Sequence, residues 1–199
     1  DQMVMEELHS EKKEKVSEYE QKHYSFPVKR DEFMFVTSPF GMRADPTTVE
    51  SGQVMHKGID IRCNKDEVLA TENNGKVVAV NQNINAPGGK SITVEYERED
   101  GSKIQNVYMH LSVIDVKLGD TVQAGQKLGV SGNTGTRTTG EHLHFAVTQI
   151  TADGSKRDVD PAIYLAEIAE KGNIETKALH DGNDLLAKYK ADPAHAQRD

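Results

Sequence analysis

Short runs of alternating apolar and polar residues, separated by turn residues, limit what this chain can fold into. Turn residues such as Gly, Asn and Asp punctuate the runs, for example at 73–75 and 100–101. Many short strands with this punctuation are typical of an antiparallel, all-β domain. The strand-like runs occupy residues 58–61, 68–70, 75–80, 91–96 and 104–111, and the pattern continues over 116–131. The sequence therefore predicts a mainly β fold, built as an antiparallel β-sheet or sandwich.

The two ends of the chain have a different character. Residues 1–23 are dense in Glu and Lys, which favour helix and support each other at helical spacing. Residues 165–171 and 184–190 also favour helix, the first ending at Gly172. We predict a helical N-terminal flank over 1–30, a β domain over 31–165, and a helical or disordered C-terminal tail over 166–199.

Composition excludes some classes of function. The net charge is −8, so a general nucleic-acid-binding role is not expected, because phosphate binding depends on Lys and Arg. No run of 18 apolar residues and no signal segment is present in this chain. The single cysteine, Cys63, cannot form an internal disulfide, and we expect it to be a small buried residue.

Two histidines flank Leu143 in a strand-like run at 142–147. Side chains alternate along a strand, so His142 and His144 share one face while Leu143 and Phe145 point into the core. Two imidazoles on one face are a natural beginning for a metal site, because neutral imidazole is a common metal ligand. Two solvated surface histidines are the simpler explanation, and this pattern alone does not distinguish them.

Two other runs carry His or Asp in the same way. Ile59 and Ile61 alternate with Gly58 and Asp60, so His56 and Asp60 are expected to share a face with no side chain between them. In the run 107–111, alternation places Val107, Met109 and Leu111 on the apolar face, with His110 opposite, beside Tyr108.

These motifs together resemble a known family. HxxxD at 56–60, the histidine of YMHL at 110 and HLH at 142–144 resemble, in this order, the lysostaphin/LytM-type zinc metallopeptidases of peptidase family M23. The phrases SPFGMR at 38–43 and LGDTVQAGQKLG at 118–129 are also similar to family segments. The likeness extends from about residue 36 to residue 164 and implies a LytM-like β domain.

The resemblance also implies a site and a reaction. The metal ligands would be His56, Asp60 and His144, the cofactor Zn²⁺, and the catalytic residues His110 and His142. Strand spacing alone allows both histidines of HLH to bind one ion, so their different roles come from the resemblance. The implied activity is endopeptidase cleavage of peptidoglycan stem or cross-bridge peptides by metal-activated water, in the periplasm, at the cell envelope or outside the cell.

Three other functions are compatible with parts of the sequence. A LytM-like regulator without catalysis would share the fold, although such members usually lose ligands, and all five site residues are present here. A cell-envelope assembly module could bind a protein partner through the helical flanks. A carrier domain of similar β architecture would explain residues 118–129 but has no use for HxxxD. The bond cut and the oligomeric state are not predicted.

Overall fold

The fold is mainly β, as the sequence predicts. The structure is a computed structural model, and it describes residues 23–29, 33–44, 53–174 and 177–190. The helical N-terminal flank predicted over residues 1–30 lies outside the described residues except for 23–29, which form extended chain with isolated bridges at Tyr24 and Val28. Within the described ranges, no helix is long and apolar enough to cross a membrane.

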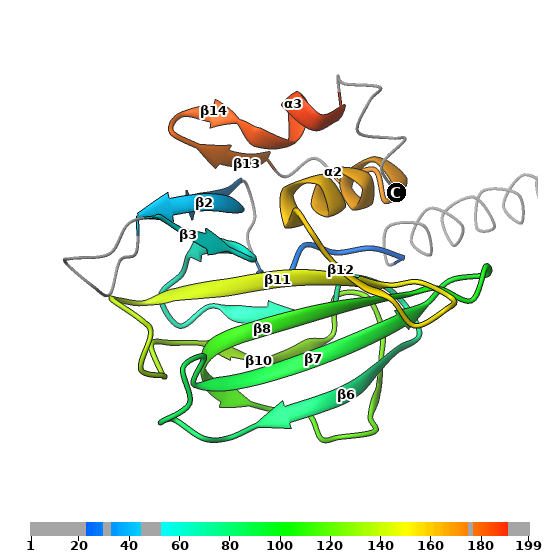
Figure 1. Ribbon diagram of the computed structural model, residues 1–199, viewed down its shortest axis with the longest axis horizontal. Helices are drawn as coiled ribbons and strands as arrows, with labels where there is room; N and C mark the ends of the chain where they lie inside the picture. The colour runs from blue at the N-terminus through cyan, green and yellow to red at the C-terminus, as the bar shows by residue number, and fades with distance from the viewer. Residues whose placement is uncertain (1–22, 30–32, 45–52, 175–176, 191–199) are drawn as a thin grey trace, which may run out of the picture.

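Fourteen strands and two helices are described (Figure 1). The strands are β1 (Phe33–Ser38), β2 (Gly41–Ala44), β3 (Gln53–His56), β4 (Ile59–Arg62), β5 (Glu67–Leu69), β6 (Gly75–Asn81), β7 (Lys90–Glu97), β8 (Lys103–Ile114), β9 (Thr121–Val122), β10 (Lys127–Ser131), β11 (His142–Ile150), β12 (Lys156–Val159), β13 (Lys177–His180) and β14 (Asn183–Asp184). The helices are α2 (Pro161–Lys171) and α3 (Leu185–Lys190).

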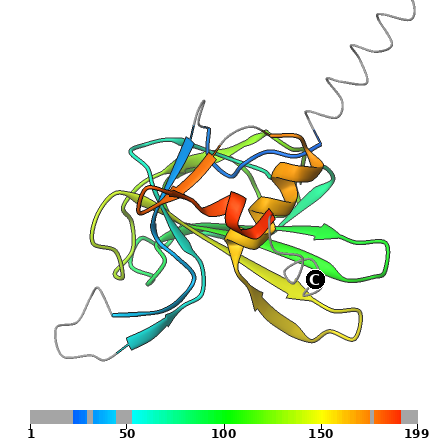
Figure 2. The same ribbon diagram turned by 90° about the horizontal axis from the view of Figure 1, so that it is seen from above.

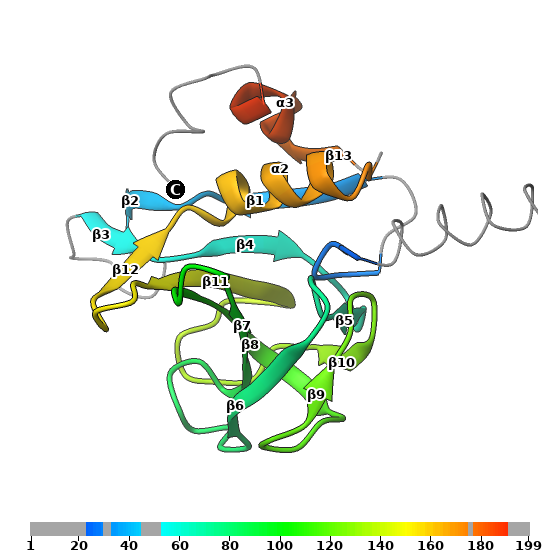
Figure 3. The same cartoon turned by 90° about the vertical axis from the view of Figure 1, so that its right-hand side faces the viewer.

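Most of the strands join one large sheet. Its order is β14-β13-β1-β4-β11-β8-β7-β6-β9, with β10 beside β5 and β8, and β12 beside β11. The described pairings are antiparallel except for the parallel pair β1–β13. Central strands β4, β11 and β8 lie side by side in this sheet, so chain segments more than 80 residues apart are adjacent (Figure 3).

The core lies under one face of these central strands. Ile59 and Ile61 of β4 and Leu143, Phe145 and Val147 of β11 are fully buried. These residues alternate with residues of the opposite face, which include Asp60, His142 and His144, as the period-2 pattern predicts. The prediction that Leu143 and Phe145 point into the core is therefore confirmed, and Cys63 is also buried, as expected.

The C-terminal segment packs on the domain. Helix α2 begins after Asp160, whose carboxylate accepts from the Ala162 N–H, and ends at Gly172. Its buried face includes Leu165 and Ile168, which join the core. Helices α2 and α3 lie together on one side of the sheet with β13 (Figures 1 and 2). The division of the chain at residues 30 and 165 stays a prediction, and the sequence pattern did not predict strand β13.

Two local predictions are wrong. The polar stretch 43–54 predicts a surface loop, but its described ends, residues 43–44 and 53–54, belong to β2 and β3, and residues 45–52 lie outside the described residues. Strands β2 and β3 pair as a separate ribbon that stands out from the body of the sheet (Figure 2). The face assignment in β8 is also wrong: Tyr108 is fully buried in the core, whereas Val107 and Met109 are half-buried on the other face.

An extra residue in β8 explains the second error. Between the pairs Lys90↔Leu111 and Ile92↔Tyr108, β7 advances two residues and β8 advances three. His110 takes a left-handed conformation, with φ 62°, at this β-bulge. The bulge reverses the alternation, so Leu111 returns to the core while His110 leaves the side on which Tyr108 lies.

Candidate metal centre and active site

The register of β4 against β11 brings two predicted site residues together. His144 is the direct cross-strand partner of Asp60 in this antiparallel pair. Residues opposite each other on one face have neighbouring side chains. The His144 Nδ1 atom accordingly lies 3.1 Å from Asp60 Oδ1.

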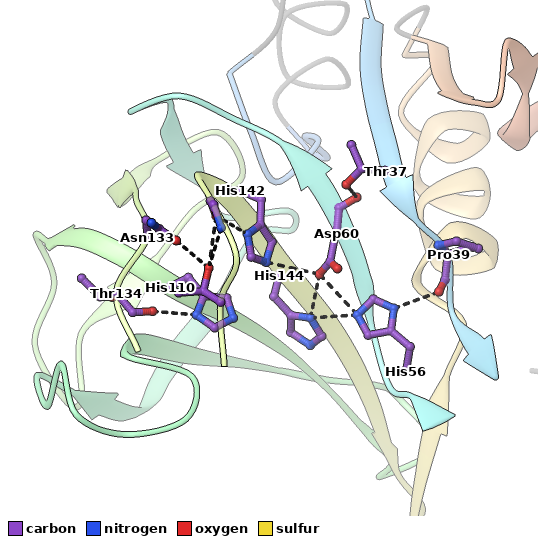
Figure 4. A network of polar contacts seen from close by, with 11 residues as sticks. Thr37, Pro39, His56, Asp60, His110, Asn133, Thr134, His142 and His144 are labelled. Carbon is purple, nitrogen blue, oxygen red and sulfur yellow. Dashed lines mark hydrogen bonds and ion pairs between the residues drawn. The ribbon is translucent and has the colours of Figure 1, made fainter. Parts of the chain in front are cut away.

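His56 reaches the same point from the separate ribbon. It is the last residue of β3, and its Nδ1–H donates to the Pro39 carbonyl at 2.8 Å. The other ring nitrogen, Nε2, lies 3.3 Å from Asp60 Oδ1 and 3.2 Å from His144 Nδ1 (Figure 4). His56, Asp60 and His144 therefore present three potential ligand atoms to one point.

This cluster contains more acceptors than hydrogens. Because a carbonyl only accepts, the proton of neutral His56 is on Nδ1, and its Nε2 atom holds a lone pair. Asp60 Oδ1 is also an acceptor, so at most one proton, on His144, lies among the three atoms when both rings are neutral. Although burial opposes ionisation, the hydrogen bond from His144 and the neighbouring imidazoles of His56 and His142 hold the pKa of the Asp60 carboxyl well below its usual range.

The donor set fits a small divalent cation. Ligand atoms about 2.0–2.1 Å from a tetrahedral zinc ion are about 3.3 Å from one another. The three separations here are 3.1, 3.2 and 3.3 Å. Two imidazole nitrogens and one carboxylate oxygen are ligands that zinc commonly takes.

Gly58 leaves the space that His144 occupies. A Cβ atom at this position would lie 2.6 Å from the Phe145 carbonyl oxygen and 2.7 Å from His144 Nε2. The prediction that His56 and Asp60 share one face of a single strand-like run is wrong, because His56 ends β3 and Asp60 lies in β4. The two residues belong to different ribbons, and Gly58 makes room for the imidazole of the facing strand.

His110 and His142 form a second pair beside the cluster. Their ring centroids are 4.8 Å apart, and His142 Nε2 is 3.5 Å from Asp60 Oδ1. His110 donates from Nδ1 to the Thr134 carbonyl, and His142 from Nδ1 to the Gly140 carbonyl, each at 2.7 Å. Both rings therefore carry their lone pair on Nε2 when neutral. Burial lowers the pKa of His110 to about 4, which keeps this ring neutral at pH 7.

The cluster of His56, Asp60 and His144 and the pair His110 and His142 line one open cleft of about 520 Å³. Among the residues that the structure describes, Asp60 is the only acid lining it, whereas Lys57 and Arg137 line it as cations. Its apolar lining comes from β3, β8 and a loop before β7. The lining residues are Thr37, Ser38, Val54, Met55, His56, Lys57, Asp60, Pro87, Gly88, Met109, His110, Arg137, Thr139, His142 and His144.

Sequence reasoning missed the backbone groups that orient the histidines. The carbonyls of Pro39, Thr134 and Gly140 each accept from a ring Nδ1–H. A carbonyl acceptor leaves no signature in residue type, because every residue has one. The five predicted site residues are brought together, and their individual roles stay predictions.

Comparison with known proteins identifies the family. The model of "Peptidase family M23" matches residues 54–161, more than half of the chain. Lysostaphin of Staphylococcus simulans is 31% identical over 159 residues, covering 78% of this chain and 31% of that protein. Peptidoglycan DD-endopeptidase ShyA of Vibrio cholerae is 37% identical over 90 residues, covering 45% and 19%.

A solved structure shares the fold. It is described as a zinc containing peptidase from Vibrio cholerae, with a TM-score of 0.50 and 31% identity, covering 70% of this chain and 39% of that one. The chain spans about a fifth to a third of the length of the two curated relatives. The resemblance on which the motif analysis rests is confirmed, and the chain belongs to peptidase family M23.

Proposed function

We propose that this chain is a zinc-dependent endopeptidase that hydrolyses peptide bonds in the stem or cross-bridge peptides of bacterial peptidoglycan. One observation carries the proposal: three ligand atoms of His56, Asp60 and His144 converge to within 3.1–3.3 Å, with a histidine pair beside them in an open cleft. Three protein ligands and an open position are typical of catalytic zinc.

His56, Asp60 and His144 would hold the ion. A bound zinc ion supplies Lewis acidity, which polarises a carbonyl and brings the pKa of bound water near ~7. Asp60 would contribute a negative charge that offsets part of the charge of the ion. Pro39 keeps His56 Nε2 unprotonated through the hydrogen bond to Nδ1, so the ring is ready to bind without losing a proton.

His110 and His142 would move protons and support developing charge. Each directs a neutral Nε2 atom away from its carbonyl partner, so each can accept a proton from an attacking water. Once protonated, the ring becomes a donor that can stabilise an oxyanion or protonate the leaving amine. Such a group contributes about 10²–10⁴-fold in rate.

The substrate class is supported by the relatives. ShyA is named as a peptidoglycan endopeptidase, and a cleft lined by the cations Lys57 and Arg137 suits a substrate that contains carboxylates. We place the enzyme at the bacterial envelope, in the periplasm or outside the cell, because that is where this substrate lies. Residues 31–165 would form the peptidase domain between two flanks, which could bind an envelope protein.

The alternative is a regulator of the same fold that binds a partner without catalysis. Loss of a ligand or of a proton-transfer group would favour it. All five side chains are present in this chain, and in the structure their rings and carboxylate face one cleft. We therefore favour the enzyme.

The test combines metal analysis with digestion of purified peptidoglycan and mass spectrometry of the fragments. The wild-type protein should bind one equivalent of zinc and release peptides with new termini, which also identifies the bond that is cut. The His144→Ala variant should lose both zinc and activity. The His142→Ala variant should keep zinc and lose most of its activity.

Thr136→Ala is the matched control. Thr136 is exposed on the loop that leads into β11 and His142, and its side chain does not line the cleft. Wild-type hydrolysis in either histidine variant would contradict the assigned roles. A wild-type protein that binds zinc stoichiometrically but releases no peptide from walls of several cross-link types would favour the regulator.

A further inference from the structure

Thr134 lies at the junction of His110, β7 and β8, outside the set of residues that the motifs identified. We propose that Thr134 is a positioning residue, whose hydroxyl holds the β8 bulge and thereby keeps His110 in its reactive orientation and tautomer. The inference rests on the proposed function only in giving His110 a catalytic role; the claim about its orientation does not depend on that role.

The backbone of His110 needs external support. Its φ of 62° is in the left-handed region of backbone conformation, which residues other than glycine rarely adopt. A residue held in such a conformation costs about 1–3 kcal/mol, and it persists only where surrounding contacts determine it. The contacts around residue 110 therefore decide whether the ring faces the cleft.

Two of these contacts involve His110 directly. Its backbone N–H donates to the Gly88 carbonyl at 2.7 Å, and its Nδ1–H donates to the Thr134 carbonyl at 2.7 Å. The first fixes the chain at the bulge, and the second fixes the plane of the ring and the nitrogen that carries the proton. The Nε2 atom is then left as the acceptor, in a ring 4.8 Å from that of His142.

The Thr134 hydroxyl ties this carbonyl to both neighbouring strands. It donates to the Leu111 carbonyl at 2.6 Å, directly after the bulge, and accepts from the Lys90 N–H at 3.0 Å, at the start of β7. One hydroxyl thus connects the two strands whose register slips here. Among short side chains, only the hydroxyl of Thr or Ser can donate one hydrogen bond and accept another at the same atom.

The loops on either side are interlocked around the same residue. A Cβ atom on Gly89 would lie 2.3 Å from the Thr134 carbonyl carbon, and one on Gly135 would lie 2.5 Å from the Gly89 nitrogen. The Thr136 N–H donates to the Ala86 carbonyl at 3.1 Å. Because the loops touch through glycine backbones, a small displacement of Thr134 moves the carbonyl that orients His110.

The experiment compares Thr134→Val with Thr134→Ser. Valine keeps the branched shape and removes both hydroxyl bonds, whereas serine keeps the hydroxyl. The matched control is Thr136→Val, two residues away, whose exposed side chain makes no hydrogen bond among the described residues. Each protein is assayed for zinc content, for kcat and KM on a soluble wall peptide, and for the ¹⁵N resonances of the His110 ring.

Thr134→Val should bind zinc as the wild type does and lose about 10–100-fold in kcat with little change in KM, the loss typical of groups that orient a functional histidine. Its His110 resonances should change from a single Nδ1-protonated form to a mixture of tautomers. Thr134→Ser should restore both readouts, and Thr136→Val should match the wild type. If valine prevents folding, Thr134→Ala removes the hydroxyl without placing a methyl group against the Leu111 carbonyl and carries the same expectation.

An unchanged His110 tautomer in the folded variant without the hydroxyl would overturn the proposal, as would a loss of kcat that serine does not rescue. The failure of the proposed function looks different. The wild-type protein would then cleave no wall peptide, while the nitrogen resonances of His110 would still report whether Thr134 orients the ring.

Discussion

Replacing Asp60 by Asn should abolish the stabilisation of the fold by zinc, measured for each protein as the difference between its stability with zinc and its stability with chelator. Asp60 Oδ1 faces His56 Nε2 and His144 Nδ1 at 3.3 and 3.1 Å, and at most one proton lies among them. A bound cation would resolve this crowding of acceptors in the wild type. An asparagine amide resolves it differently, because its N–H₂ group can donate to an imidazole nitrogen.

The size of the effect follows from linkage. Zinc at 100 times its dissociation constant adds about 2.7 kcal/mol to the free energy of unfolding when it binds only the folded state. For a chain of 199 residues, 1 kcal/mol shifts Tm by about 2–4 °C. Wild-type protein should therefore gain about 5–11 °C when zinc replaces chelator. Asp60→Asn should gain almost nothing, since it loses the negative charge and replaces one carboxylate oxygen by an N–H₂ group that cannot bind the ion.

Differential scanning calorimetry in chelator and in zinc measures both quantities. Asp115→Asn is the control, because Asp115 is an exposed acid on the loop after β8 that pairs with Lys127 at 3.4 Å. It should keep the full response to zinc. A response of wild-type size in Asp60→Asn, or a wild type that zinc does not stabilise, would refute the reasoning.

Three further substitutions test the surrounding structure. Gly58→Ala should reduce zinc affinity at least tenfold in a metal titration, because the added Cβ would lie 2.6 Å from a backbone oxygen of Phe145 in the facing strand. Arg98→Met should lower the free energy of unfolding in urea by about 3 kcal/mol without changing zinc content, because it leaves the buried Glu72 carboxylate without its bidentate partner. Leu143→Ala should cost about 2–5 kcal/mol in the same assay, the range for a fully buried leucine.

The regular parts of the site were predictable from the sequence. In β4 and β11 the alternation is uninterrupted, so apolar residues such as Ile59 and Leu143 reach the core and the opposite parity reaches the cleft. Which strands are neighbours was not predictable from the residues, because the pairing of His144 with Asp60 joins positions 84 residues apart. Family resemblance supplied that link.

The irregular parts were missed for physical reasons. Residues 56–60 do not form one continuous strand. His56 ends β3, which pairs with β2 in a separate ribbon, and β4 begins at Ile59. Strand β13 pairs in parallel with β1, whereas the sequence predicts a helical or disordered tail there, since four residues carry too little periodicity to identify a strand. The interpretation of residues 1–22 as a helical flank lies outside the described residues and stays a prediction.

The bulge at His110 connects these errors to function. A regular strand would direct residue 110 to the same side as Tyr108, into the core, and a histidine there would have no access to the cleft. The inserted residue turns the ring outward at the cost of a left-handed backbone, and two loop carbonyls, at Gly88 and Thr134, hold it there. A pattern rule fails at this position because placing His110 in the cleft requires breaking the pattern. The bulge therefore depends on contacts from two glycine-containing loops, and the residues that support His110 lie far from it in sequence, at positions 88 and 134.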